Sequence, residues 1–117
     1  MDKKELVQIK ANLRRVDLER KQDREVLRSR VFEEVKKQLL DYFSKYPQTR
    51  VYLFGSVVTS GMFSSLSDVD IAVENYPGNR LDLYAGLSAL IAHSIDVVIM
   101  ERCVFAAHIR QHGKRIQ

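Results

Sequence analysis

The sequence predicts a small α/β (α+β) domain, in which a sheet of about three strands is flanked by helices and preceded by a long N-terminal helical extension. No Gly or Pro occurs before Pro47, so nothing interrupts a helix over the first 46 residues. From Arg50 onward, short apolar segments alternate with turn residues, which is typical of strands. A segment with helical spacing of its apolar residues separates the second and third of these strands.

The N-terminal helical region divides into two parts. An apolar stripe, with intervals of three and four residues, consists of Leu6, Ile9, Leu13 and Val16. Residues 17–25 are almost entirely polar, and apolar residues then resume at helical spacing, which predicts a core-packed helix over 26–45. We therefore expect a charged helical extension at 1–25 and a domain at 26–117. The sequence leaves open whether the extension continues the same helix, folds back or stays loose.

The elements after residue 50 follow from local patterns. The expected strands are residues 50–54, 69–74 and 95–100, and the expected helices are about 80–93 and 101–112. Asn79 is a candidate N-cap for the first of these helices, because Asp82 follows three residues later. Gly113 is a candidate C-cap for the second.

Charge and composition narrow the functional classes. Residues 1–50 hold 14 Lys and Arg against 9 Asp and Glu, whereas residues 51–117 are close to neutral. The charges of the basic half alternate in sign, which favours a solvated helix face over nucleic-acid binding. The single cysteine, Cys103, rules out an internal disulfide framework. Because no apolar run of ~20 residues is present, we expect a soluble cytoplasmic protein with no membrane contact.

Three carboxylates lie in apolar, strand-like surroundings. Asp68 and Asp70 are two residues apart, so in a strand they would point to the same side, roughly 6.6 Å apart. Such a pair repels itself unless a cation lies between the two side chains. Asp96, from the next expected strand, would add a third set of oxygens. Together they predict a site for Mg²⁺, with enough oxygens for two ions about 3.5–4 Å apart.

A Gly-Ser dipeptide follows the first expected strand. Gly55 lets an anion approach the backbone, and the N–H groups of Gly55 and Ser56 could face a phosphate. Alone, this dipeptide is more often only a tight turn, and Asp residues in a Ser-rich loop more often close a turn. The combination with three acids on successive strands favours a phosphoryl- or nucleotidyl-transfer site.

These motifs resemble those of a known family. Phe54-Gly55-Ser56, then Ser67-Asp68-Val69-Asp70, then a helix and Ile95-Asp96-Val97-Val98 are similar to the polymerase-beta-type nucleotidyltransferase superfamily. The closest resemblance is to its minimal members, the MNT antitoxin-like proteins that pair with HEPN partners. The similarity covers residues 26–117 and implies a small mixed sheet of the polymerase-beta-like nucleotidyltransferase fold.

The resemblance also implies roles for particular residues. Gly55, Ser56 and Ser67 would bind the nucleotide, and Asp68, Asp70 and Asp96 would be the catalytic, metal-binding acids for two Mg²⁺ ions. The implied reaction is the transfer of a nucleoside monophosphate, AMP from ATP, to a hydroxyl on a HEPN-type toxin, which the protein would neutralise as antitoxin. The apolar stripe of the extension is a candidate docking surface for that partner, and homo-oligomer formation through it is an alternative.

Two departures from the family pattern keep a second function open. Asp68 follows Gly55 by thirteen residues, where the family commonly has twelve, and the segment 57–60 lacks the Arg that relatives often carry. The alternative is therefore a non-catalytic antitoxin that acts by binding only.

His108 and His112 are four residues apart on the last expected helix. This spacing can hold a metal ion, but no third ligand is close in sequence. The interpretation that we favour for His112 is a cation at the C-terminus of the helix.

Overall fold

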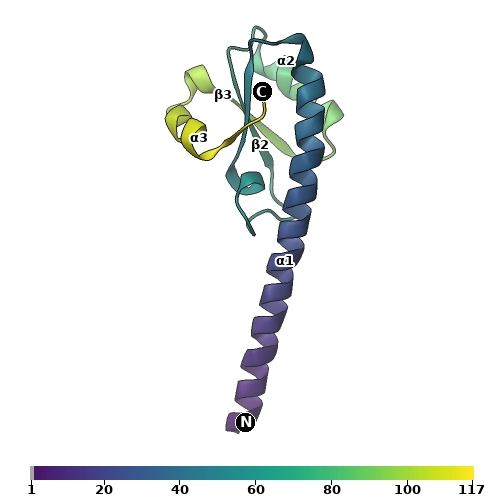
Figure 1. The fold of residues 1–117 in the computed structure, drawn as a ribbon, viewed down its shortest axis with the longest axis vertical. Coiled ribbons are helices and arrows are strands. Elements are labelled where there is room, and N and C mark those ends of the chain that lie inside the picture. The colour runs from purple at the N-terminus through teal and green to yellow at the C-terminus, as the bar shows by residue number, and fades with distance from the viewer. Residues whose placement is uncertain (1) are drawn as a thin grey trace.

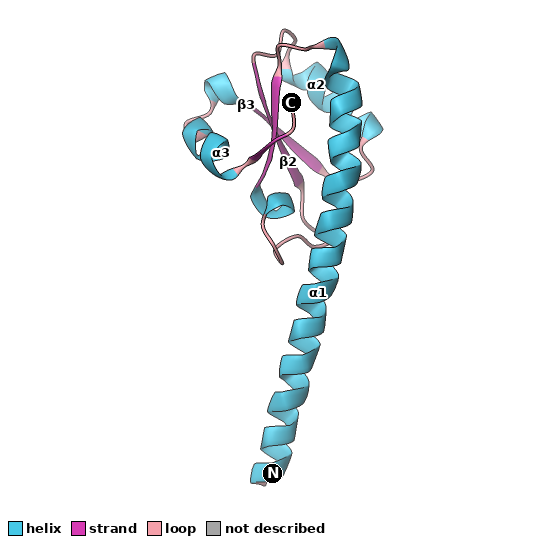
Figure 2. Ribbon diagram, in the orientation of Figure 1, coloured by secondary structure: helices cyan, strands magenta, loops and turns pink. Residues whose placement is uncertain are grey.

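A computed structural model describes residues 2–117, apart from the side chains of residues 16–19. A long helix runs along one side of a small sheet, and shorter helices complete the domain (Figures 1 and 2). The α-helices are α1 (Lys3–Tyr42), α2 (Arg80–Leu90) and α3 (Ala106–His112), and the strands are β1 (Arg50–Phe54), β2 (Val69–Glu74), β3 (Ile95–Ile99) and β4 (Lys114–Arg115). Short 3-10 helices are η1 (Phe43–Lys45), η2 (Gly55–Val58) and η3 (Met100–Arg102).

Helix α1 is one continuous helix, so the N-terminal extension continues the helix that packs on the domain. Asp2 caps it by accepting a hydrogen bond from the backbone N–H of Glu5 at 2.8 Å. The C-terminal half packs on the sheet through Val31, Val35 and Leu39, which are fully buried. The N-terminal half projects beyond the domain (Figure 1), and the molecule is 66 Å long.

The exposed half of α1 carries the predicted apolar stripe. Leu6, Ile9 and Leu13 are 45%, 40% and 63% exposed, so they have no partner in the described chain that covers them. Val16, the fourth member of the stripe, lies outside the described side chains. The division of the chain at residue 25 remains a prediction, since α1 crosses that position without interruption.

The sheet has four strands in the order β3-β2-β1-β4, one more than expected. Strands β1 and β2 are antiparallel, β2 and β3 are parallel, and β4 pairs antiparallel with β1. The resulting sheet is mixed, as the resemblance implied. The sequence analysis missed β4 because it consists of only Lys114 and Arg115, which have no apolar alternation.

Because side chains alternate along the strands, the two faces of the sheet carry separate hydrophobic cores. Val51 and Leu53 of β1, with Ile71 of β2, face α1 and α2 in the main core. Tyr52 and Ala72 face the other way and form a smaller core with residues from η3 and α3. Helix α3 therefore lies on the opposite side of the sheet from α1 (Figure 1).

Two predicted helices are shorter than expected. The helix from Arg80 ends at Leu90, because Ile91 takes an extended conformation and is buried in the main core. The helix expected over 101–112 is divided into η3 and α3, since Cys103 is extended between them. The caps at Asn79 and Gly113 are confirmed.

Within the part of the chain that the structure describes, no helix is both long and apolar enough to cross a membrane.

Candidate functional site

A row of three residues crosses the sheet at the point where β1 ends. Asp70 of β2 is in register with Phe54 of β1 on one side and with Asp96 of β3 on the other. Because side chains alternate along a strand, Asp70 lies on the same side as Ala72. The two carboxylates therefore belong to the face of the sheet that carries α3, and Gly55 follows directly at the end of the row.

Asp70 is the most perturbed acid of the site. Its pKa is raised from an ordinary value of 3.8 to about 6, chiefly because burial disfavours the charged form. The negative charges of Asp96 and Asp68 raise this pKa further. The three acids are thus close enough to interact electrostatically, although Asp68 and Asp96 are themselves exposed.

Asp68 and Ser67 lie in the loop that leads into β2, and not in the strand. Ser67 Oγ accepts a hydrogen bond from the backbone N–H of Ser64 at 3.0 Å and lies 3.3 Å from Ser64 Oγ. In this structure Ser67 therefore braces a turn immediately before Asp68.

Gly55 begins η2 with a φ of +74°, a left-handed conformation that glycine adopts without strain. It lies directly beside the carboxylate of Asp70. Its carbonyl oxygen accepts a hydrogen bond from Thr59 Oγ1 at 2.8 Å, which closes the turn. Ser56 is half-buried in the same turn. The dipeptide and Asp70, which are separated in sequence, are neighbours in the fold.

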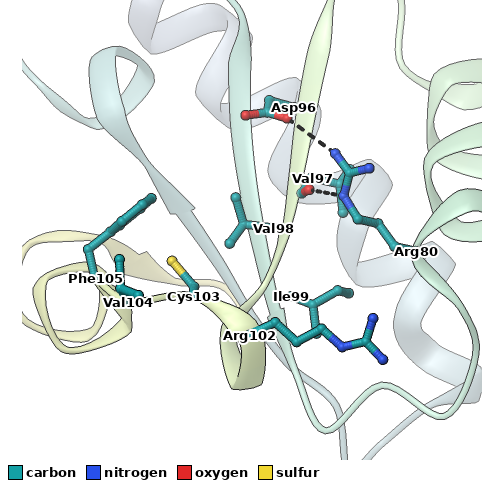
Figure 3. A pocket seen from close by; sticks show the side chains of 9 residues that line it. All are labelled: Arg80, Asp96, Val97, Val98, Ile99, Arg102, Cys103, Val104 and Phe105. Atoms are coloured by element: carbon teal, nitrogen blue, oxygen red, sulfur yellow. Dashed lines mark hydrogen bonds and ion pairs between the residues drawn. The ribbon is translucent and has the colours of Figure 1, made fainter.

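The sequence analysis missed Arg80, the first residue of α2. Its Nε donates to the carbonyl oxygen of Val97 at 2.8 Å, and its Nη2 lies 3.7 Å from Asp96 Oδ1 (Figure 3). The guanidinium thus approaches Asp96 from the outer side of β3. The sequence did offer a reason to consider Arg80 as a site residue, because it is the only Lys or Arg between residues 51 and 101.

A hollow of about 400 Å³ adjoins Asp96 and Arg80 (Figure 3). Its remaining lining comes from β3 and from the connection to α3, namely Val97, Val98, Ile99, Arg102, Cys103, Val104 and Phe105. A second hollow, of about 190 Å³, adjoins Gly55 at the other end of the row. Phe105 lines both hollows.

The middle of α1 contacts η2 and the loop that follows it, which the sequence did not predict. Glu25 Oε2 accepts a hydrogen bond from the backbone N–H of Gly61 at 2.8 Å, and Arg28 Nη1 donates to the carbonyl oxygen of Val57 at 3.1 Å. Arg28 also pairs with Glu25 at 2.5 Å. The hydrogen bond from Arg28 is the main cause that lowers the pKa of Glu25 to about 2.

Among the described residues, no group of three His, Cys, Asp or Glu side chains is close enough to hold a metal ion without rearrangement. The donor set itself, with three carboxylates and no thiolate, suits a hard divalent cation. Repulsion from Asp96 and Asp68 contributes to the raised pKa of Asp70, and a bound cation would offset that repulsion.

The fold and the sequence agree on a class of protein: a mixed sheet in which a Gly-Ser turn lies beside an acid of the central strand β2, with two further acids in the preceding loop and on the neighbouring strand β3. Residues 37–117 match the sequence model of the family described as "Polymerase beta, Nucleotidyltransferase". This match covers more than half of the chain, which therefore belongs to the polymerase beta nucleotidyltransferase family and carries a nucleotidyltransferase domain.

Two solved structures have a similar fold. One is a crystal structure of a mutant of the toxin-antitoxin pair MntA-HpeT, with 18% identity, a TM-score of 0.57, and coverage of 70% of this chain and 72% of the other. The second is the toxin-antitoxin pair MntA-HepT, with 19% identity, a TM-score of 0.51, and coverage of 70% and 68%. No curated protein matches the chain.

Proposed function

We propose that this chain is a Mg²⁺-dependent nucleotidyltransferase that transfers AMP from ATP to a hydroxyl group on a HEPN-type toxin, and that it acts as the antitoxin of that partner. The family membership supports nucleotidyl transfer in general. The nucleotide, the metal and the acceptor are the parts that the proposal adds.

One observation carries the proposal: the register that aligns Phe54, Asp70 and Asp96 across three strands, with Gly55 at the end. A phosphate chain at the Gly55-Ser56 turn would place its α-phosphate next to Asp70. The acceptor could then approach from the side of Asp96, where the hollow of about 400 Å³ opens. Donor and acceptor would meet over the central strand.

Asp68, Asp70 and Asp96 are the residues that would hold Mg²⁺. Bound there, the ion would neutralise charge on the α-phosphate and lower the pKa of the attacking hydroxyl. The raised pKa of Asp70, which burial and the charges of Asp96 and Asp68 cause, supports this assignment, because a bound cation would stabilise the carboxylate.

In the proposed reaction, the acceptor oxygen forms a bond to the α-phosphorus and the bond to the β-phosphate oxygen breaks. Pyrophosphate leaves with that electron pair on the side of Gly55. Asp96 is exposed, and an acceptor that approached through the hollow would meet it first, so its carboxylate would take the hydroxyl proton. Arg80 orients this carboxylate through its contact with Oδ1, anchored by the bond to the Val97 carbonyl.

The two solved structures described above support the proposal that the partner is a toxin. Both are structures of toxin-antitoxin pairs, and one is a mutant in which two aspartates, two positions apart, are replaced by glutamate. Asp68 and Asp70 have the same spacing in this chain. The mutated acids of that protein and the two acids of this chain therefore share one spacing.

Incubation with α-labelled ATP, Mg²⁺ and a HEPN-type partner tests the proposal. We expect label on the partner, none with Asp70→Asn, and none after chelation of the metal. A partner that binds the chain but never acquires label would contradict the enzymatic function.

That outcome is the second candidate, an antitoxin that acts by binding only. It is favoured by one observation: the three acids are not gathered closely enough to hold an ion as they lie in the described structure. Under this alternative, Asp70→Asn would neutralise the toxin as well as the wild type does.

A further inference from the structure

The smaller hollow, beside Gly55, brings together residues from distant parts of the sequence. It has a volume of about 190 Å³. One wall comes from the end of β1 and η2, and the other from the segment around α3. The lining residues are Phe54, Gly55, Val58, Thr59, Phe105, His108, Ile109, His112 and Gly113.

The segment that would hold a phosphate chain lacks a cation of its own. No Lys or Arg occurs from Gly55 to Ser67, and the nearest charge on the sheet is the carboxylate of Asp70. A triphosphate at this turn would therefore need positive charge or strong hydrogen-bond donors from another element.

His108 and His112 are the only residues of the lining that can carry a positive charge. They lie one turn apart on α3, and their ring centroids are 4.4 Å apart. Both side chains are exposed, and neither makes a hydrogen bond or an ion pair with another described residue. Their N–H groups are thus available to a ligand in the hollow.

The other polar side chain of the lining is already engaged. Thr59 Oγ1 donates to the carbonyl oxygen of Gly55. The remaining side chains are apolar, so a ligand would meet the two imidazoles and the backbone of the Gly55 turn as its polar contacts. Backbone N–H groups at a glycine turn and imidazole N–H groups can both donate hydrogen bonds to phosphate oxygens.

We propose that His108 and His112 bind the terminal phosphates of the nucleotide, so that α3 supplies side-chain donors in place of the Lys and Arg residues that the β1–β2 connection lacks. This inference rests on the proposed function, and it assigns the imidazole pair to the leaving pyrophosphate. The hollow is smaller than the roughly 300–1,000 Å³ of sites that enclose drug-sized ligands, which suits a phosphate chain and not a whole nucleotide.

Calorimetry with inorganic tripolyphosphate, ATP and AMP, each with Mg²⁺, tests the inference on the full chain. The variant is His108→Ala with His112→Ala, which removes both side-chain donors, and melting temperatures check that it folds. The matched control is His93→Ala, because His93 lies outside the hollow and near Glu34 of α1, with 3.8 Å between Nε2 and Oε2.

We expect the double variant to bind tripolyphosphate and ATP about tenfold or more weakly, since two hydrogen bonds to charged oxygens are lost. AMP affinity should be unchanged, because AMP lacks the β- and γ-phosphates, and the control should behave as the wild type. Equal tripolyphosphate affinity in wild type and double variant would overturn the inference, and so would no binding by the wild type.

A metal site is the competing interpretation of the pair. If the wild type binds Zn²⁺ through the two imidazoles, and the double variant loses Zn²⁺ binding but keeps tripolyphosphate binding, the phosphate assignment is wrong. The proposed function is judged separately, by label transfer to the partner. Tripolyphosphate binding that depends on the histidines, without any transfer, would uphold the phosphate site and reject the enzyme.

Discussion

The α-carbon of Gly55 lies against the carboxylate of Asp70, and a Cβ atom at position 55 would come within 2.3 Å of Asp70 Oδ2. No side chain fits in that space unless the carboxylate moves. The end of β1 and the buried acid of β2 are therefore mutually constrained, and the absence of a side chain at Gly55 is a steric requirement of the site as well as a conformational one.

Gly55→Ala should lower the free energy of unfolding by about 1–2 kcal/mol, because alanine is strained at positive φ. It should also displace Asp70 and abolish the rise in melting temperature on adding ATP and Mg²⁺. Gly61→Ala is the matched control: its φ is +73°, but a Cβ there would meet nothing within 4 Å. It should show the same strain and keep the ligand response. Loss of the response in both variants would mean that backbone strain, and not the contact with Asp70, is responsible.

Asp70→Asn should stabilise the metal-free protein at pH 7.5 by about 1 kcal/mol, after allowance for solvent screening. The pKa of Asp70 is about 6 in the folded protein and 3.8 ordinarily, so the charged folded form is disfavoured. That penalty is complete above pH 6 and disappears as the pH falls toward 3.8. Melts in EDTA should therefore show the variant's advantage shrinking between pH 6 and 4. Asp41→Asn, at an exposed carboxylate of α1, is the control, and its difference in melting temperature from the wild type should not shrink in this way.

Arg80→Ala should reduce nucleotidyl transfer roughly tenfold, the usual effect of losing a group that orients a metal-site ligand. Stability should hardly change, because the side chains of Arg80 and Asp96 are 54% and 52% exposed. Arg80→Lys should not restore activity, since an ammonium cannot hold the Val97 carbonyl and reach Asp96 together. Full activity in the lysine variant would show that charge alone matters. Rates of label transfer at saturating ATP measure both variants.

Glu25→Gln should lower the melting temperature at neutral pH by roughly 3–6 °C, because a neutral amide replaces the carboxylate that pairs with Arg28 and accepts a hydrogen bond from the Gly61 N–H. The pKa of Glu25 is about 2 in the folded protein, against an ordinary 4.5. Its contribution is therefore complete above pH 4.5 and is lost as the pH falls toward 2. The melting temperatures of variant and wild type should converge over that range. Glu33→Gln, at an exposed position of α1, provides the comparison.

Leu6→Ser with Leu13→Ser should weaken binding of a HEPN-type partner by roughly tenfold, if the apolar stripe is the docking surface. The melting temperature should not change, because both side chains are exposed on the projecting half of α1. Leu81→Ser, at a more exposed leucine on α2, serves as the control. Unchanged partner affinity would place the docking surface elsewhere. A loss of self-association in sedimentation would instead assign the stripe to a homo-oligomer.

Local chemistry explains which parts of the fold could be predicted. The core-packed helix from residue 26, the three apolar strands and the caps at Asn79 and Gly113 depend on spacing and on neighbouring residues, whereas the continuity of α1 through residue 25 was left open by the sequence. The two-residue strand β4 could not be predicted, because Lys114 and Arg115 join the sheet only by pairing with β1. The break at Cys103 is likewise set by packing, since it lets Met100 and Ile109 reach the same small core.

For the site, local sequence was enough to predict the residue types: a Gly-Ser turn and three acids on or next to strands, in a spacing that resembles one family. Their positions relative to one another depend on the tertiary fold. Strand register aligns Asp70 with Asp96, and chain topology brings Arg80, His108 and His112 to the two ends of that row. These contacts join residues far apart in the sequence, and they depend on pairing and packing energies that no local pattern records.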